Sequence, residues 1–344
     1  MDSKRLILSV AGSGKTTHII NSLNADNRAL ILTYTDNNYE NLRIKVAEKF
    51  GHIPDNILIM TYFEFLYSFC YRPFLHRIVG ANGYNFSAPP RFTTQLKRTN
   101  MKYYLDQSNC LYHNRLAKLL EVKGIVPKIN ERVEKYFDEI YIDEVQDFGG
   151  HDFNLLTALS QAQSNVMFVG DFFQHTFDTS RDGNVNSSLH DNYEKFVKRF
   201  IDIGFSVDNE TLCKSHRCSK SICKFVNDQL GISINSYSEI DTDVILVEDQ
   251  KVIDEIMNNS EIIKLFLQNS TKYCCYSTNW GASKGQDCHM DVCVVLNAKT
   301  YSEYKKNKLH QMNTQTRNKF YVACTRARRK LIFIPEKAVK AYKK

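Results

Sequence analysis

A glycine-rich segment near the N-terminus has residue types and spacing suited to holding phosphate. It reads SVAGSGKT from Ser9 to Thr16, directly after an apolar run and directly before apolar residues with helical spacing. Gly12 and Gly14 let backbone N–H groups turn toward phosphate oxygens, and the helix that follows presents its positive end to them. Lys15 would reach the β- and γ-phosphates, while the Thr16 hydroxyl would bind Mg²⁺. The segment therefore predicts a site for a nucleoside triphosphate with Mg²⁺.

Two adjacent carboxylates follow a second apolar run. Asp143 and Glu144 would lie at the carboxyl end of a strand, the edge of a parallel sheet at which phosphates bind. Asp143 is expected to hold Mg²⁺ through water, and Glu144 to polarise the water that attacks the γ-phosphorus. Gln174 follows another apolar run and could sense the γ-phosphate or orient that water. An acidic turn after a strand is common by itself, but the pair is more specific when it follows a phosphate-binding loop.

The composition describes a globular chain of two domains. Its 344 residues are 43% hydrophobic, enough for a core in each domain, and the net charge of +7 is compatible with a polyanionic partner. No apolar stretch is long enough to cross a bilayer, and the first residues do not resemble a signal peptide. We therefore expect a cytoplasmic protein that does not bind membranes, with its ten cysteines reduced.

Short apolar runs alternate with helical patterns along most of the chain, which predicts βαβ units and an α/β fold with mainly parallel sheets. Strands are expected at residues 5–9, 29–33, 57–60, 139–142, 166–169, 244–247, 273–276, 292–296 and 331–334. The strand signal vanishes in residues 63–135, which are predicted to form a short helical insertion in the first domain. We place the boundary near residues 202–209, which gives domains of residues 1–205 and 206–344.

Short motifs along nearly the whole chain resemble those of superfamily 1 DNA helicases of the UvrD/Rep/PcrA type. Eight segments match in the family's order, at residues 11–17, 32–37, 61–65, 143–147, 170–174, 215–219, 283–287 and 321–328. The resemblance implies two RecA-like domains in tandem, a P-loop NTPase fold, with most of the family's usual insertions missing.

The resemblance also assigns the parts of an ATP site. It places Arg217 and Arg326 at the γ-phosphate, with Arg326 as the arginine finger of the second domain. His216 stands where the family often has a tyrosine that stacks on adenine, although a lone histidine is as readily a packed or solvated residue. The nucleotide-binding residues implied are Ala11, Gly12, Ser13, Gly14, Lys15, Thr16, Thr17, His216, Gly285 and Asp287, with Asp287 where a family glutamate contacts ribose. The adenine-reading glutamine motif has no counterpart before Ser9, so the choice between ATP and GTP stays open.

Six residues are placed by the resemblance along the path of a single DNA strand: Thr33, Tyr34, Thr35, Thr61, Tyr62 and Phe63. Hydroxyls would hold phosphates and aromatic rings would stack on bases. At least half of the aromatic residues that follow Thr61 should instead pack in a core, because alternate aromatic residues usually do so.

Two functions of different classes remain open. The resemblance implies a DNA-dependent ATPase, a helicase that hydrolyses ATP between its two domains while it moves 3′→5′ on single-stranded DNA or at a single/double-strand junction. The alternative is a nucleotide-dependent switch that binds DNA or protein within a repair or anti-phage complex, with little unwinding by itself. The combination of Lys15, Glu144 and Arg326 favours the enzyme, because a pure binding module has no chemical need for a base and an arginine finger. A small-molecule kinase would have no use for a second arginine-bearing domain.

Overall fold

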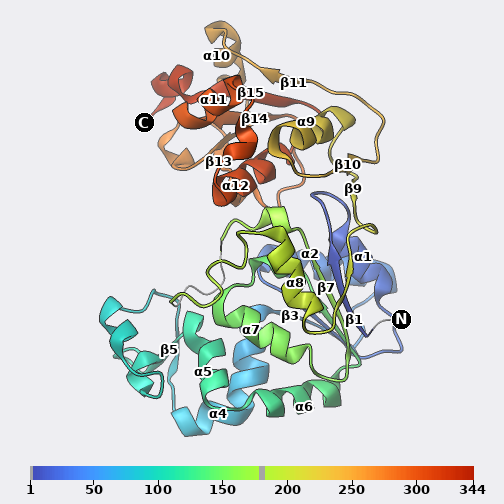
Figure 1. Cartoon of the computed structure of the whole chain (residues 1–344), viewed down its shortest axis with the longest axis vertical. Coiled ribbons are helices and arrows are strands. Elements are labelled where there is room, and N and C mark those ends of the chain that lie inside the picture. The colour runs from blue at the N-terminus through green and yellow to red at the C-terminus, as the bar shows by residue number, and fades with distance from the viewer. Residues whose placement is uncertain (1–2, 178–182) are drawn as a thin grey trace. The chain divides into compact units, whose positions relative to one another are not determined.

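The computed structural model describes residues 3–177 and 183–344, which form two compact units (Figure 1). The first unit contains the chain up to Ile7, then Thr16–Gly170, and then the chain from Phe177 to Asp208. The second contains Asn209–Lys344 and takes in two short earlier segments, Leu8–Lys15 and Asp171–Thr176. Leu8–Lys15 contains most of the phosphate-binding loop, and Asp171–Thr176 follows the strand predicted at 166–169. Both segments therefore belong to the same unit as the C-terminal half of the chain.

A six-stranded sheet forms the centre of the first unit, in the order β3-β2-β6-β7-β1-β8. The strands are β1 (Lys4–Leu8), β2 (Ala29–Thr33), β3 (Ile57–Thr61), β6 (Glu139–Ile142), β7 (Asn165–Gly170) and β8 (Ser206–Asp208). The pairs β1–β8, β2–β3, β2–β6 and β6–β7 are parallel. Every residue of β2 is buried, as expected for a strand that helices cover on both faces. The predicted α/β fold with parallel sheets is confirmed.

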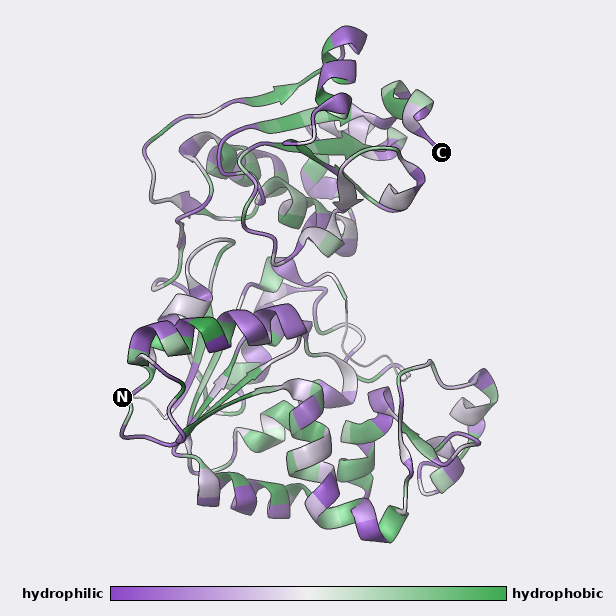
Figure 2. Cartoon of the chain, turned by 180° about the vertical axis from the view of Figure 1, so that it is seen from behind, coloured by the Kyte–Doolittle hydropathy of each residue, from purple (hydrophilic) through white to green (hydrophobic). Residues whose placement is uncertain are grey.

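Helices connect these strands and supply their covering layers. They are α1 (Lys15–Ser22), α2 (Asp36–Phe50), α3 (Tyr62–Glu64), α4 (Arg72–Val79), α5 (Leu116–Val122), α6 (Val126–Tyr136), α7 (Gly150–Leu159) and α8 (Tyr193–Ile201). Figure 2 shows hydrophobic residues along the strands of both units and hydrophilic residues in the loops and on parts of the helices. Among the helices of the described residues, none is both long enough and apolar enough to span a bilayer.

The segment 63–135 is mainly helical but is not free of strands. A π-helix at Phe65–Tyr71 leads into α4, and a small parallel pair joins β4 (Gly83–Asn85) to β5 (Cys110–Tyr112). The sequence predicted a helical insertion and did not reveal this strand pair, because strands of three residues are too short to show a period of two. Figure 1 shows β5 at the periphery of the first unit, away from the six-stranded sheet.

The second unit is built on a five-stranded parallel sheet in the order β11-β15-β14-β12-β13. Its strands are β11 (Val244–Leu246), β12 (Ile263–Phe266), β13 (Ser277–Asn279), β14 (Val292–Leu296) and β15 (Leu331–Pro335), and β9 (Lys214–Ser215) pairs separately with β10 (Asn235–Ser236). Its helices are α9 (Lys220–Leu230), α10 (Gln250–Asn258), α11 (Ala298–Lys305) and α12 (Thr314–Cys324).

The strands of the second unit differ from the predicted ones at several positions, and β9, β10, β12 and β13 were not predicted. The predicted strand at 273–276 is wrong: Tyr273 follows a 3₁₀ turn and makes only an isolated bridge to Lys343. The strand β12 was not predicted, because Lys264 interrupts its apolar run. That lysine is nevertheless fully buried, with its ammonium group donating to the Asn259 carbonyl. At the boundary between the halves, β8 pairs with β1, so the first unit extends to Asp208.

Candidate nucleotide-binding site

The phosphate-binding loop leaves β1 and ends where α1 begins. Gly12 and Gly14 have φ angles of +70° and +90°, in a region that residues other than glycine rarely adopt. The backbone N–H of Ala11 donates to the Tyr321 hydroxyl at 2.9 Å, and the Gly12 carbonyl accepts from the His216 N–H at 2.8 Å. All of these residues belong to the second unit, so the loop is held in place by β9 and α12.

The loop has the features of a phosphate cradle. Across residues 3–177 and 183–344, the Ser13 hydroxyl is among the buried polar groups that have no hydrogen-bond partner. A phosphate oxygen would supply that partner, which matters because a buried unsatisfied hydroxyl is unfavourable. A Cβ at Gly12 would lie 2.7 Å from the Arg217 Cβ, so a larger residue does not fit there. The loop residues therefore fit the triphosphate of a nucleotide.

Two buried carboxylates follow β6. The Asp143 N–H donates to the Leu32 carbonyl at 2.9 Å, and the Asp143 carboxylate accepts from the Glu144 N–H at 2.9 Å. Glu144 has φ +56° and ψ +45°, a left-handed conformation that is strained for a residue with a side chain. Its carboxylate accepts a hydrogen bond from the Gln146 side-chain amide. Burial and backbone strain distinguish this turn from a solvated acidic turn, and such strain is characteristic of functional sites.

Oxygen donors suited to Mg²⁺ are present in the first unit. The Thr16 hydroxyl belongs to the first turn of α1, and the Asp143 carboxylate follows the last residue of β6. Mg²⁺ is usually held by one or two protein oxygens together with phosphate oxygens and water. This pair of donors therefore fits the metal that accompanies a nucleoside triphosphate.

Gly170 ends β7 directly against the acidic turn. A Cβ there would lie 2.3 Å from the Gln146 Oε1 and 2.8 Å from the Val145 Cγ1, with the Val145 backbone nitrogen 3.1 Å away. Because backbone cannot move aside as a side-chain end can, we expect Gly170→Ala to lower the free energy of unfolding by about 1–3 kcal/mol. Thermal unfolding followed by circular dichroism measures the loss. Gly83→Ala is the matched control, since its Cβ would meet nothing closer than 3.8 Å. Equal midpoints for both variants would contradict the packing argument.

A buried tyrosine connects the loop to the residues that follow β7. The Tyr321 hydroxyl donates to the Asp171 Oδ2 at 3.1 Å, and the same oxygen accepts from the Gln174 Nε2 at 2.9 Å. Burial, and then the nearby Asp171 carboxylate, raise the pKa of Tyr321 well above its ordinary value. The hydroxyl therefore stays protonated, so it can accept from Ala11 while donating to Asp171. The sequence did not single out Tyr321, because an aromatic residue on a buried helix is ordinarily read as core.

Two guanidinium groups meet at one carboxylate in the second unit. The Arg217 Nη2 lies 2.6 Å from the Asp287 Oδ1, and the Arg326 Nη1 lies 3.1 Å from the same oxygen. Arg326 is only 2% exposed, and its Nε donates to the Val322 carbonyl at 3.1 Å. The Arg217 Nη1 donates to the Thr325 carbonyl at 3.1 Å. The two arginines are thus fixed by backbone carbonyls in a position to bind one anion together.

The residues implied for the base and the sugar lie beside these arginines. The His216 ring stacks on the Tyr237 ring, with centroids 3.9 Å apart and 13° between the planes. The Lys214 ammonium lies 5.5 Å from the Tyr237 centroid. Gly285 has a φ angle of +82° in the turn that leads to Asp287, whose carboxylate pairs with the arginines. Tyr237 was not predicted, because its polar surroundings in the sequence carry no motif.

Several of the six residues predicted to contact a nucleic-acid strand have other roles in the structure. Thr33 is fully buried in β2. Tyr62 is also buried, and its hydroxyl donates to Asp152 at 3.2 Å, so its ring is closed to a base. Burial, followed by the Asp152 carboxylate, raises the pKa of Tyr62 well above its ordinary value. Thr35 and Thr61 accept N–H hydrogen bonds as the N-caps of α2 and α3. The side chains of Thr33 and Tyr62 are therefore closed to solvent in this structure, and the contacts of the six residues with a nucleic-acid strand stay predictions.

Tyr34 and Phe63 keep part of their rings exposed. The Tyr34 ring lies 5.6 Å from the Phe177 ring, and the Phe63 ring lies 4.8 Å from the Tyr84 ring, measured between centroids. Of the aromatic residues that follow Thr61, those at positions 62, 65, 69 and 71 are buried, as the packing argument predicted. The other two rings of this run, those of Phe63 and Tyr67, are partly exposed.

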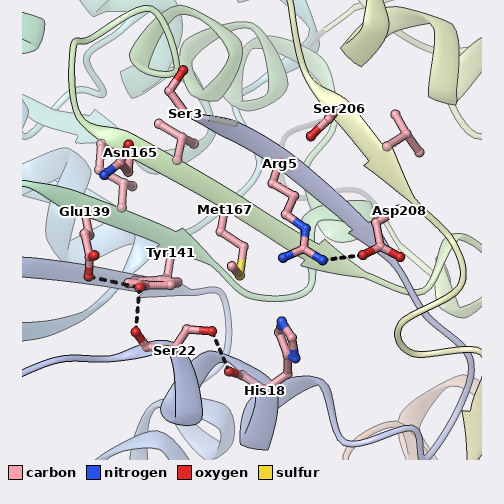
Figure 3. Close-up of a pocket in the computed structure, with 13 residues that line it drawn as sticks. Ser3, Arg5, His18, Ser22, Glu139, Tyr141, Asn165, Met167, Ser206 and Asp208 are labelled. Atoms are coloured by element: carbon pink, nitrogen blue, oxygen red, sulfur yellow. Dashed lines mark hydrogen bonds and ion pairs between the residues drawn. The ribbon is translucent and has the colours of Figure 1, made fainter. Parts of the chain in front are cut away.

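A polar cavity of about 850 Å³ lies elsewhere on the first unit, between four strands and α1 (Figure 3). Arg5 pairs there with Asp208, and the Tyr141 hydroxyl donates to the Glu139 carboxylate at 3.0 Å. Burial lowers the pKa of His18, which lines the same cavity. The predicted nucleotide-binding residues are not among those that line it, so we do not assign the nucleotide to this cavity.

Tandem parallel sheets, a glycine-rich loop before a helix, buried acids after a strand and two converging arginines define a P-loop NTPase with two RecA-like domains. Residues 90–196 match the family model of the UvrD/REP helicase N-terminal domain. This match covers less than half of the chain, and it agrees with the resemblance to UvrD-type helicases that the motifs indicate. No curated protein matches it.

Viral helicases are among the solved structures to which the chain is similar. The complex of arterivirus nonstructural protein 10, a helicase, with DNA shares 13% sequence identity at a TM-score of 0.50, covering 96% of this chain and 60% of that one. The helicase of PRRSV shares 15% identity at a TM-score of 0.46, covering 97% of this chain and 52% of that one. The chain spans less than two thirds of the length of these helicases, and the first similarity shows the fold alone.

Proposed function

We propose that the chain is an ATP-driven motor that hydrolyses ATP in order to move along single-stranded DNA, with unwinding of a single/double-strand junction as a consequence. The observation that carries the proposal is the pair of guanidinium groups, from Arg217 and Arg326, that converge on one anionic group. A nucleotide-binding module without chemistry has no need for two fixed cations of this kind, whereas phosphoryl transfer needs them to neutralise developing charge.

Residues from several motifs have distinct parts in the proposed hydrolysis. The loop from Ala11 to Thr17 would bind the triphosphate, with Lys15 at the β- and γ-phosphates. Thr16 and Asp143 would hold Mg²⁺, which would neutralise phosphate charge. Glu144 takes the proton of the attacking water, and Gln174 orients that water.

The arginines respond to the γ-phosphate, because a phosphate group that binds them competes with the Asp287 carboxylate that they contact here. His216, backed by Tyr237, is assigned to the base, and Gly285 with Asp287 to the sugar.

The direction of movement is proposed as 3′→5′ on the family resemblance, and the location as the cytoplasm on the composition of the chain. Most of the insertions usual in the family are missing from this sequence. Their absence favours a protein partner, in a repair or anti-phage complex, that completes the unwinding function. The helicase solved with DNA supports a nucleic-acid partner for this chain, and the choice between DNA and RNA is left to experiment.

The test is steady-state phosphate release by the purified chain with ATP or GTP, with and without single-stranded DNA or RNA. We expect strong stimulation by a single strand and loss of turnover in Lys15→Ala, because the loop then lacks its cation at the β- and γ-phosphates. Weak turnover that no nucleic acid stimulates would contradict the motor and favour the alternative of a nucleotide-dependent switch.

A further inference from the structure

An aromatic cluster on the inserted segment of the first unit is open to solvent. Phe63, Tyr67, Tyr84 and Phe86 form it, together with His113. The Tyr84 ring lies 4.8 Å from Phe63, 5.1 Å from Tyr67 and 5.2 Å from Phe86, measured between centroids. The Phe86 ring lies 5.0 Å from Phe63 and 5.1 Å from His113. We refer to these five residues as the aromatic cluster.

Two of its members present most of this open surface. Tyr84 is 44% exposed and Phe86 is 60% exposed, whereas the other three are half-buried. Tyr84 lies in β4 and Phe86 follows two residues later, so both side chains project from the same face of that strand. Single exposed hydrophobic residues are common on protein surfaces, but contiguous exposed aromatic rings indicate an interaction site.

The local backbone holds the two exposed rings in place. β4 pairs with β5, where Tyr84 stands opposite the buried Leu111. The Asn85 side chain donates to Asp106 at 2.7 Å and accepts from the Ser87 N–H at 2.7 Å. Rings that are already fixed lose little conformational freedom when a partner stacks on them, which favours binding.

The charge of the surrounding segment selects the kind of partner. Residues 63–135 contain twelve lysines and arginines and five acidic residues, so the whole net charge of +7 lies in this segment and the rest of the chain is neutral. A positively charged segment that carries exposed, stacked aromatic rings matches a single nucleic-acid strand, whose phosphates are negative and whose bases have apolar faces. A duplex hides those faces inside its stack.

We propose that the aromatic cluster binds single-stranded nucleic acid, with bases stacking on Tyr84 and Phe86. The inference rests on the proposed function for its choice of partner, but apart from Phe63 it locates a contact surface that lies outside the family motifs. It also extends the path from Phe63, the predicted contact that remains partly exposed, to β4. Stacking of this kind is tolerant of sequence, as a motor that moves along a strand requires.

The test compares binding of a fluorescein-labelled oligodeoxythymidine by the full chain and by Tyr84→Ala/Phe86→Ala, using fluorescence anisotropy without nucleotide. We expect the double variant to bind about ten-fold more weakly for each stacked base that is lost. The dependence of affinity on salt should keep its slope, because contacts with phosphates remain. Oligouridine replaces oligodeoxythymidine in a parallel arm to distinguish RNA from DNA, and a duplex of the same length should be insensitive to the substitutions.

Phe92→Ala is the matched control, since Phe92 is 66% exposed in the same segment and lies outside the aromatic cluster. Tyr84→Phe should keep wild-type affinity because it keeps the ring. Phe86→Ala alone provides the comparison if the double variant unfolds. Wild-type affinity in the double variant, or an equal loss in Phe92→Ala, would overturn the proposal.

Basal phosphate release by the same variants separates the two proposals. If the wild-type chain releases no phosphate from ATP, the proposed function fails while the binding comparison still stands. If the double variant keeps basal turnover and binds the strand as tightly as the wild type, only the aromatic cluster is misassigned. A cluster that serves a protein partner or a second copy of the chain would give this second result.

Discussion

Glu144→Gln should lower the rate of ATP hydrolysis by about 10²–10⁴-fold and leave nucleotide binding nearly unchanged. The substitution keeps the length of the side chain and one oxygen that can accept from the Gln146 amide, but an amide cannot take a proton from water at neutral pH. It also leaves the left-handed backbone at this position occupied by a residue of the same size. The change therefore separates chemistry from binding. Phosphate release measures the first, and the affinity for a fluorescent ATP analogue measures the second.

Glu40→Gln is the matched control for this experiment, because Glu40 is an exposed glutamate on α2 in the same unit. Thermal unfolding of both variants checks that the fold is intact. Turnover at the wild-type rate in Glu144→Gln would show that the water is activated by another group. Loss of analogue binding would instead assign Glu144 to holding the metal or the phosphates.

The positions of Asp143, Glu144 and Gln174 could be predicted from the sequence because each one follows a strand of the sheet in the first unit. Asp143 and Glu144 come directly after β6, and Gln174 comes four residues after the end of β7. A strand that is buried on both faces produces an apolar run, and the polar residues that follow it are displayed at one edge of the sheet. This local signal needs no knowledge of the tertiary structure.

What the sequence could not predict depends on contacts between distant residues. The hydrogen bonds of Tyr321 join Ala11 to Asp171, and no local pattern distinguishes such a tyrosine from an ordinary core residue. The stack of His216 on Tyr237 is hidden for the same reason. The buried Lys264 ammonium donates to the Asn259 carbonyl, which follows α10. This contact cannot be seen in the sequence, so the strand β12 that contains Lys264 was not predicted. Pairing that arises only after folding leaves no mark in composition or periodicity.

In the inserted segment, too, the sequence predicts only part of the structure. Its aromatic residues predict packing, and burial of half of them bears this out, but the sequence does not say which rings stay outside. That division is set by β4 and β5, which are too short to be recognised. The exposed rings of the aromatic cluster are consequently visible only once the strand pairing is known.

Arg326→Ala should lower the DNA-stimulated rate of hydrolysis by about 10³–10⁵-fold, while the affinity for single-stranded DNA stays close to that of the wild type. The guanidinium group neutralises charge that develops in the transition state, so its removal raises the barrier without affecting a distant strand. Arg326→Lys should recover little, because a lysine keeps the charge but not the planar fork that reaches the Val322 carbonyl and the shared anion together.

The buried position of Arg326 requires a control for folding. Arg329→Ala serves this purpose, since Arg329 is an exposed arginine that pairs with Asp291 in the same unit and has no assigned part in the site. A surface pair of this kind contributes little to stability, so both its unfolding midpoint and its turnover should match the wild type. If Arg326→Ala loses DNA affinity in proportion to its rate, the arginine belongs to the nucleic-acid interface. If the loss of rate is explained by a loss of folded protein, Arg217 alone contacts the γ-phosphate, and the convergence of two arginines on one carboxylate is a packing feature of the second unit.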